Sequence, residues 1–281
     1  MQEFTRTYAK IICGTSCKPV PVGYNISVIT ICFNNLSELI RTINSVDSQK
    51  IKPFQHFIVD GSTNSEIRNY LEQNSQPSYR QWISEPDDGI ADAFNKGVLA
   101  SSGDIVNMLN SGDCYDRSDV IEIVQNTFQN DEKLMWIYGK MYRMKGDQRV
   151  LVGKKFSPKK LYRGMRCISH QTMFFKKKLH DRYGLYDQTL KIAMDYDFVC
   201  RIAFEKSKFI EMPMIDFLPE GIGSNAFEGL KEVKIVYERY YGKSLKLFFW
   251  QLRLKTLHVL LQTKFGLFLN RVKIWLKLEN F

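Results

Sequence analysis

Acidic, amide and glycine residues lie at both ends of one short apolar run, in the part of the sequence between residues 84 and 113. The apolar run, 105–109, can form a buried strand, and the Asn-Ser-Gly-Asp turn at 110–113 follows it. Ligands of open α/β sheets bind at the carboxyl ends of the strands. Carboxylate and amide oxygens at such an edge suit a diphosphate accompanied by a divalent cation.

The elements that must position these residues alternate between strands and helices. Apolar runs predict strands at 26–33, 54–59, 80–84, 105–109 and near 136–138, and helical spacing predicts helices at 36–43, 67–71, 88–100 and about 118–130. This alternation predicts a parallel sheet in a nucleotide-binding half. A basic region from 143 to 166 has no clear period, so we expect it to be irregular.

The composition fits one main globular domain. The chain has 281 residues, of which 44% are hydrophobic and 25% charged. No apolar run approaches the ~18 residues of a membrane span, and the first ten residues do not resemble a secretory signal, so we expect a cytoplasmic protein. The six cysteines are scattered, which argues against a disulfide framework, and Cys13 and Cys17 lack a second pair at zinc spacing.

Positive charge and aromatic residues gather in the last fifth of the chain. Eleven Lys or Arg stand against three Glu in 231–281, within a chain whose net charge is +10. A basic, aromatic-rich helix suits an anionic membrane surface. The alternative is a helical hairpin that packs on the core and turns its basic face to solvent. No nucleic-acid-binding motif accompanies the charge, so we expect no nucleic-acid partner.

Four ordered motifs together resemble the family 2 inverting glycosyltransferases, which have a GT-A fold. They are the segments 26–35, 59–63, 84–113 and 195–201, within a resemblance that covers roughly residues 24–216. The resemblance implies an α/β fold with a Rossmann-like, mostly parallel sheet flanked by helices, followed by a basic amphipathic helical extension. The implied organisation is an N-terminal arm (1–23), a catalytic domain (24–222) with a nucleotide-sugar half (24–113) and an acceptor half (114–222), and a helical tail (223–281).

Asp113 is the metal ligand that the resemblance implies, with Mg²⁺ or Mn²⁺ as the cofactor. A divalent cation neutralises the diphosphate leaving group. The family often carries a second Asp immediately before this position, where Gly112 stands here. One firm carboxylate therefore remains, and metal independence stays open. Asp113 could alternatively be a turn residue or a helix cap.

The donor would be a nucleotide-diphosphate sugar, with a UDP-sugar favoured. A carboxylate at a strand end can accept hydrogen bonds from a base imide or from ribose hydroxyls. Taken alone, Asp60 would be a strand-ending turn residue and Asp88 a helix cap. The resemblance implies a set of donor-binding residues: Thr30, Asn34, Asp60, Asp88, Asp92, Asn95 and Asn110.

Inverting transfer needs one general base, and the resemblance places it at Asp195. Asp195 opens a predicted helix, whereas Asp197, two residues on, cannot share its face and is expected to be structural. Arg166, His170 and Gln171 are candidates for contacts with the acceptor or a phosphate. A lone histidine such as His170 is equally well explained as a structural residue.

The sequence therefore predicts an inverting, non-processive transferase of bacterial surface-polysaccharide synthesis. The Q-x-x-R-W element of processive synthases is absent. The acceptor would be a saccharide, lipid-linked if the tail binds membrane, and the enzyme would be peripheral to the inner face of the cytoplasmic membrane. The alternative is a catalytically inactive scaffold of the same fold at the membrane. A nucleotidyltransferase would need a glycine-rich, basic phosphate loop after the first strand, and residues 31–35 offer none.

Overall fold

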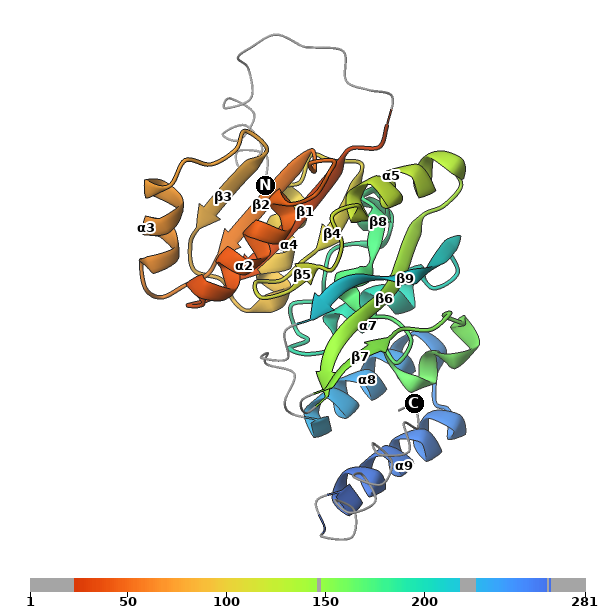
Figure 1. Cartoon of the computed structure of the whole chain (residues 1–281). Helices are drawn as coiled ribbons and strands as arrows, with labels where there is room; N and C mark the ends of the chain where they lie inside the picture. Colours follow the sequence, from red (N-terminus) through yellow and green to blue (C-terminus); the bar gives the residue numbers. More distant parts are fainter. Residues whose placement is uncertain (1–22, 146–147, 218–225, 262, 264–281) are drawn as a thin grey trace.

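The computed structural model describes residues 23–145, 148–217, 226–261 and 263. Within these residues, nine strands form one sheet whose order is β3-β2-β1-β4-β8-β6-β9-β5, with β7 paired to β6. Helices lie on both sides of the sheet, and the long strand β6 runs from its middle toward the C-terminal helices (Figure 1). Of the predicted arm, only residue 23 is described, and the tail beyond 263 also lies outside the described residues.

The first half is the parallel sheet that the alternating pattern predicts. Its strands β1, β2, β3 and β4 pair in parallel, and helices α2, α3 and α4 connect them. The bounds are β1 (Ile26–Cys32), α2 (Leu36–Asp47), β2 (Gln55–Asp60), α3 (Glu66–Gln73), β3 (Arg80–Ser84), α4 (Ile90–Ala100) and β4 (Ile105–Met108). The strand and helix predictions for this half are confirmed, and the carboxyl ends of β1, β2 and β4 meet at one edge.

Strand β1 is buried on both faces, as expected for the centre of a parallel sheet. Val28 packs in a core cluster with Val124 and Phe128, whereas Ile29, which points the opposite way, packs with Phe94. Helix α4 lies close above β1 because it has a glycine where they meet. A Cβ atom at Gly97 would come within 2.3 Å of Ile29 Cγ2.

The second half of the sheet is mostly antiparallel. β8 pairs antiparallel with β4 and β6, β6 pairs in parallel with β9, and β9 pairs antiparallel with β5. Its elements are β5 (Cys114–Tyr115), α5 (Val120–Asn130), β6 (Trp136–Lys145), β7 (Gln148–Val152), η1 (Pro158–Arg163), η2 (His170–Thr172), β8 (Phe174–Lys176), α6 (Lys178–Tyr183), α7 (Met194–Ile202) and β9 (Ser207–Phe217).

The expectation of an irregular region from 143 to 166 is wrong for its first part. β6 continues to Lys145 and pairs with β7, and a 3₁₀ helix, η1, follows. Long-range pairing of β6 with β9 extends the strand as far as Arg143. Such pairing is set by the partner strand rather than by local propensity, so a polar sequence does not exclude it.

Two C-terminal helices, α8 (Ala226–Tyr241) and α9 (Leu245–Leu261), follow the sheet. α8 packs on α7, and α9 packs on η1. α9 has two apolar faces: Leu247 and Leu254 lie toward the body, while an exposed stripe lies opposite. The stripe consists of Leu245, Phe248, Phe249 and Leu252. Across the described ranges, no helix combines the length and hydropathy that a membrane crossing requires.

Candidate active site

The sequence predicts donor binding at the edge of the sheet where β1 and β2 end side by side. We call it the donor edge. Cys32 and Asp60 are register partners in the parallel ladder, and Asp60 is fully buried. Ser84 Oγ donates to Asp60 Oδ2 at 2.8 Å, and the backbone N–H of Ser62 donates to Oδ1 at 3.0 Å. These bonds fix the orientation of the carboxylate at the edge of the sheet. Asp60 therefore lies at the edge of the sheet where the sequence predicts ligand binding.

Asn34 braces the loop that follows Asp60. Its backbone N–H donates to Ser62 Oγ at 2.8 Å, and its side-chain Oδ1 accepts from the N–H of Thr63 at 3.1 Å. Asn34 has a φ of 52°, a left-handed conformation that asparagine tolerates better than most residues. The structure therefore places Asn34 as a support for the donor edge.

Thr30 lies inside the sheet, below the donor edge. Its hydroxyl is fully buried and lies 3.0 Å from His56 Nε2, whose Nδ1 accepts from Arg80 Nε at 3.2 Å. Burial, with a smaller contribution from Arg80, lowers the pKa of His56 to about 3. Because alternate residues of a strand share a face, Cys32 occupies the strand-end position that the sequence interpretation gave to Thr30. The sequence could have indicated this, because Cys32 is nearer than Thr30 to the end of the apolar run.

Cys32 is held as a thiol at this edge. Its Sγ lies 3.8 Å from Asp60 Oδ1, and burial together with the charge of Asp60 raises the pKa of the thiol. Asp87 approaches the same edge. A Cβ atom at Gly61 would lie 1.8 Å from Asp87 Oδ2, so only glycine leaves room for that carboxylate. Asp87 was not among the predicted site residues.

The predicted donor-binding residues of α4 and of the loop before it differ in burial and in hydrogen-bond partners. Asp88 is exposed, and its N–H donates to Asp92 Oδ2 at 3.2 Å. Asp92 Oδ1 accepts from Gln188 Nε2 at 2.9 Å. Asn95 is buried and exchanges two bonds with the backbone of Tyr186, at 2.9 and 2.8 Å. Asp92 and Asn95 thus tie α4 to the loop that leads to α7, and the side-chain amide of Asn95 is occupied by that role.

The metal-side turn follows β4. Gly112 has a φ of 96°, which favours glycine at the place where the family often has an acid. Thr42 Oγ1 accepts from the N–H of Gly112 and donates to the carbonyl oxygen of Asp113, both at 2.8 Å. α2 thereby holds the turn, and the Asp113 side chain is nearly buried.

Two oxygen atoms of this turn are buried without hydrogen-bond partners among the described residues: Asn110 Oδ1 and Ser111 Oγ. Buried polar atoms are normally paired, so such atoms point to a bound group. Oxygen donors are the ligands that Mg²⁺ and Mn²⁺ prefer. The oxygens of Asn110 and Asp113 therefore fit a divalent cation. Within the described ranges, no cluster of three or more His, Cys, Asp or Glu residues suits a metal.

Asp195 stands at the start of α7, across from this turn. His170 connects the two: its Nδ1 lies 3.5 Å from Asp195 Oδ2, and its Nε2 lies 3.2 Å from Asn110 Nδ2. An amide donor on Nε2 leaves the ring proton on Nδ1, which faces the carboxylate. Asn110, His170 and Asp195 thus form a continuous polar chain from the end of β4 to the start of α7. Residues 60 and 85 positions apart in sequence meet here.

Asp197 is structural, as its position in the helix predicts. Its carboxylate is buried and pairs with Arg201 at 2.9 Å and with Arg239 at 3.2 Å, and Tyr240 Oη donates to it at 2.9 Å. Asp195 remains partly exposed, with about a fifth of its side chain accessible. Of the two acids, Asp195 is the one available to a ligand.

Glu232 of α8 positions the start of α7 and was missed by the sequence interpretation. Its carboxylate accepts the backbone N–H groups of Lys191, Ile192 and Ala193 at 3.0, 2.8 and 2.8 Å. This segment immediately precedes Asp195. No sequence signal links a glutamate on a later helix to the loop, because the contact depends on how α8 packs against α7.

The other two acceptor-side candidates have different surroundings. Gln171 is buried, and its backbone oxygen accepts from Asn107 Nδ2 at 2.9 Å. Arg166 is exposed and lies near Trp250 of α9, with 5.5 Å between its Cζ and the ring centroid. The structure brings Asp195, His170 and Asn110 together, and it places Arg166 with the C-terminal helices.

The sheet order and the opposed turns at β4 and α7 define a GT-A fold, and comparisons with solved structures agree. TarS of S. aureus in complex with UDP-GlcNAc has a TM-score of 0.58 at 15% identity, covering 79% of this chain and 69% of that chain. The mannosyltransferase PcManGT from Pyrobaculum calidifontis, in complex with GDP-Man and Mn²⁺, has a TM-score of 0.57 at 16% identity, covering 88% and 73%.

Sequence comparison then identifies the family. The model described as Glycosyl transferase family 2 matches residues 27–184. An uncharacterized glycosyltransferase of Mycobacterium tuberculosis is 32% identical over 224 residues, covering 76% of this chain and 85% of that protein. A chondroitin synthase of Pasteurella multocida is 28% identical over 191 residues, covering 66% of this chain and 19% of that protein. The chain belongs to glycosyl transferase family 2 and is a glycosyltransferase.

Proposed function

We propose that this glycosyltransferase moves a sugar from a nucleotide-diphosphate sugar to a hydroxyl of a saccharide acceptor, with inversion at the anomeric carbon. The observation that carries the proposal is the polar chain Asn110–His170–Asp195. It sets one partly exposed carboxylate across from the turn that suits a cation and a diphosphate. A single base opposite the leaving group is the arrangement that inverting transfer requires.

The nucleoside would bind at the edge formed by Cys32, Asp60 and Asp87. Carboxylates there can accept from base and ribose donors, and the backbone at Gly61 allows close approach. We favour a UDP-sugar donor, which agrees with the UDP-GlcNAc bound to TarS, although the second structural neighbour holds GDP-Man. Thr30 is left out of the proposed contacts because its hydroxyl lies beside His56. Asn34, Asp88, Asp92 and Asn95 would shape the pocket through the bonds described above.

Asp113 and the Asn110 side-chain oxygen would hold Mg²⁺ or Mn²⁺, and the Mn²⁺ complex of PcManGT supports this assignment. The cation would neutralise the charge that develops on the diphosphate. With Gly112 in place of a second acid, the protein would supply few ligands of its own. Metal binding should therefore depend on the presence of the donor.

Asp195 would act as the general base. Its Oδ1 already accepts the N–H of Tyr196 at 2.7 Å, which leaves Oδ2, beside His170, for the acceptor hydroxyl. The hydroxyl proton would move to Oδ2 as the alcohol oxygen bonds to the anomeric carbon, and the anomeric C–O bond to the diphosphate would break on the opposite side. His170 would hold the carboxylate in this orientation.

The acceptor would be a lipid-linked saccharide, extended by one sugar at a time at the inner face of the cytoplasmic membrane. The exposed apolar stripe of α9 and the basic residues beside it suit insertion into an anionic surface. Relatives include a chondroitin synthase and a glycosyltransferase of PGL/p-HBAD biosynthesis. A role in surface polysaccharide or glycolipid synthesis agrees with both.

The substitution Asp195→Asn tests the proposal. It should lower the rate of sugar transfer by roughly 10²- to 10⁴-fold, the usual contribution of a positioned base. Stabilisation of the fold by UDP-sugars plus Mn²⁺, measured as a shift in Tm, should persist. Asp181→Asn, on the exposed surface of α6, is the matched control and should retain full activity. Undiminished transfer by Asp195→Asn would refute the base assignment, and a wild-type protein that binds donors without transfer would favour the scaffold alternative.

A further inference from the structure

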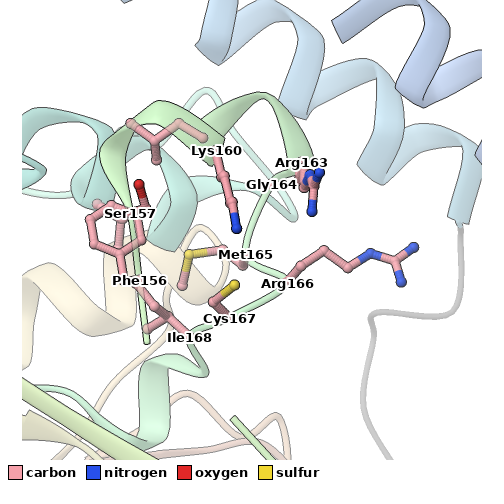
Figure 2. A pocket seen from close by; sticks show the side chains of 11 residues that line it. Phe156, Ser157, Lys160, Arg163, Gly164, Met165, Arg166, Cys167 and Ile168 are labelled. Atoms are coloured by element: carbon pink, nitrogen blue, oxygen red, sulfur yellow. The ribbon is translucent and has the colours of Figure 1, made fainter. Parts of the chain in front are cut away.

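Three arginines surround one tryptophan where η1 meets α9. The guanidinium carbons of Arg163, Arg166 and Arg253 lie 5.1, 5.5 and 5.3 Å from the centroid of Trp250. Arg163 ends η1, Arg166 lies in the loop that follows it, and Arg253 belongs to α9. Figure 2 shows Arg163 and Arg166 on the side of this loop opposite Phe156. Two segments separated by more than 80 residues thus build one cationic cluster.

Within the part of the chain that the structure describes, the three charges lack an acidic counterpart. Among the described residues, no carboxylate lies within 4.0 Å of any of the three guanidinium groups, whereas Arg201 and Arg239 on neighbouring helices both pair with Asp197. Arg166 keeps part of its surface exposed, but partial desolvation, followed by the charges of Arg253 and Arg143, lowers the pKa of its guanidinium. Contact with the π face of Trp250 compensates only part of such repulsion. An anion bound among these groups would relieve it.

The space beside the cluster has the size and chemistry for such an anion. A cavity of about 240 Å³ is lined by Arg163, Arg166, Leu230, Val233, Trp250 and Leu254, among others. The indole N–H of Trp250 is buried and has no hydrogen-bond partner in the described chain. Guanidinium forks and a free N–H donor match phosphate oxygens. The aliphatic wall from α8 and α9 could contact an apolar part of the same ligand.

The cluster is connected to the proposed catalytic side chains through a short stretch of backbone and one hydrogen bond. Arg166 precedes His170 by four residues, so their Cα atoms lie within about 14 Å of each other even if the chain is fully extended. At the other end of the loop, Tyr196 Oη donates to the carbonyl oxygen of Leu161 at 2.7 Å, and Tyr196 follows Asp195. A ligand spanning this short distance would place one end at the base and its anionic end among the arginines.

We infer that Arg163, Arg166, Arg253 and Trp250 bind a phosphate or diphosphate group attached to the acceptor saccharide. α9 is then part of the acceptor site as well as a candidate membrane contact, since the exposed stripe that includes Phe248 and Leu252 lies on its opposite face. The assignment rests on the proposed transferase function for its choice of acceptor. Phospholipid headgroups offer the same phosphate chemistry, so the test separates the two sources.

Inorganic pyrophosphate is the probe, titrated calorimetrically into the full-length protein in EDTA so that metal-dependent donor binding is suppressed. The wild type should bind it, and Arg166→Gln and Arg253→Gln should each weaken binding at least tenfold. Trp250→Phe, which removes the N–H but keeps an aromatic ring, should weaken it severalfold. Lys255→Gln, an exposed residue of the same helix, is the matched control and should stay within twofold. Absence of wild-type binding, or equal binding by all variants, would overturn the inference.

Sedimentation with phosphatidylglycerol vesicles identifies the source of the phosphate. If the cluster serves the acceptor, Arg253→Gln and Lys255→Gln should reduce vesicle binding by the same small factor, and pyrophosphate should not release the protein. Selective detachment of Arg166→Gln and Arg253→Gln would assign the cluster to bilayer headgroups and overturn the acceptor assignment.

Asp195→Asn separates this inference from the proposed function. The variant should bind pyrophosphate as the wild type does while failing to transfer sugar. Loss of transfer in Asp195→Asn together with no pyrophosphate binding by the wild type would contradict only the proposed anion site. Normal pyrophosphate binding together with unchanged transfer by Asp195→Asn would contradict only the assignment of Asp195 as the general base.

Discussion

The donor edge and the η1–α9 region have opposite charge, although both are proposed to bind phosphate groups. The donor edge presents Asp60, Asp87 and Asp113 at the ends of strands, where a diphosphate would be repelled unless a cation lay between them. The η1–α9 region presents three arginines that can contact phosphate oxygens directly. Phosphate binding should therefore need metal at the first region and no metal at the second.

Removal of Asp113, the proposed metal ligand, should have the largest effect and is the sharpest test of this difference. Asp113→Asn should lower transfer at least 10²-fold and abolish the Mn²⁺-dependent part of donor stabilisation, because the turn loses its carboxylate. EDTA should reproduce the loss in the wild type and add little in the variant. Pyrophosphate binding at the arginine cluster should be unchanged. The donor-induced shift in Tm could instead be unchanged both by EDTA and by Asp113→Asn. The donor edge would then not use metal, and the proposed difference between the two regions would be contradicted.

Loosening the support of α7 should have a smaller effect, confined to the chemical step. Glu232→Gln replaces charge-assisted bonds to three backbone N–H groups with weaker neutral ones. We expect kcat to fall about tenfold, equivalent to about 1.4 kcal/mol, with donor stabilisation intact. Glu238→Gln, on the same helix beside Lys234, is the control. Equal loss of donor binding and kcat would show that Glu232 supports the whole fold rather than the position of Asp195.

At neutral pH the smallest effect concerns stability beneath the donor edge, and it grows only as the pH falls. The pKa of His56 is lowered to about 3 in the folded state. Below pH 6.5 the unfolded state therefore binds a proton at His56 that the folded state does not bind. His56 should therefore cost stability as pH falls from about 6.5 toward 3, by up to about 1.4 kcal/mol per pH unit. Urea denaturation of His56→Gln should show a shallower pH dependence in this window than the wild type and the control His258→Gln. Parallel curves would contradict the depressed pKa.

Much of the donor half could be predicted from the sequence because its signals are local. Apolar runs ending in polar turns located β1, β2 and β4, and parallel strands necessarily bring such ends to one edge. The structure differs from the expected site at residues whose exposure depends on register. Thr30 and Cys32 share a face of β1, and only the pairing with β2 shows that Cys32 reaches the edge. Similarly, the contact with Gly61 shows that Asp87 is the acid beside Asp60.

The acceptor half was less predictable because its contacts join distant segments. The sequence named Asp195 and His170 but gave no reason for His170 to bridge Asp195 and Asn110. It treated the C-terminal basic residues as one surface, whereas the structure separates a stripe of apolar side chains from an arginine cluster. The β6–β7 hairpin was missed because pairing between strands makes these segments strands, β6 with β9 and β7 with β6, and their composition does not.

The sequence alone determined the order of strands and helices in the first half of the sheet and the family to which the chain is similar, because hydrophobic period and turn chemistry act over a few residues. Only the tertiary structure showed how each acid is held: buried in ion pairs, hydrogen-bonded to a loop, or left partly exposed. Asp195 and Asp197 are chemically identical, and Arg239 with Tyr240 engages one of them while His170 approaches the other. Such choices depend on helix packing across long sequence separations, which local patterns do not encode.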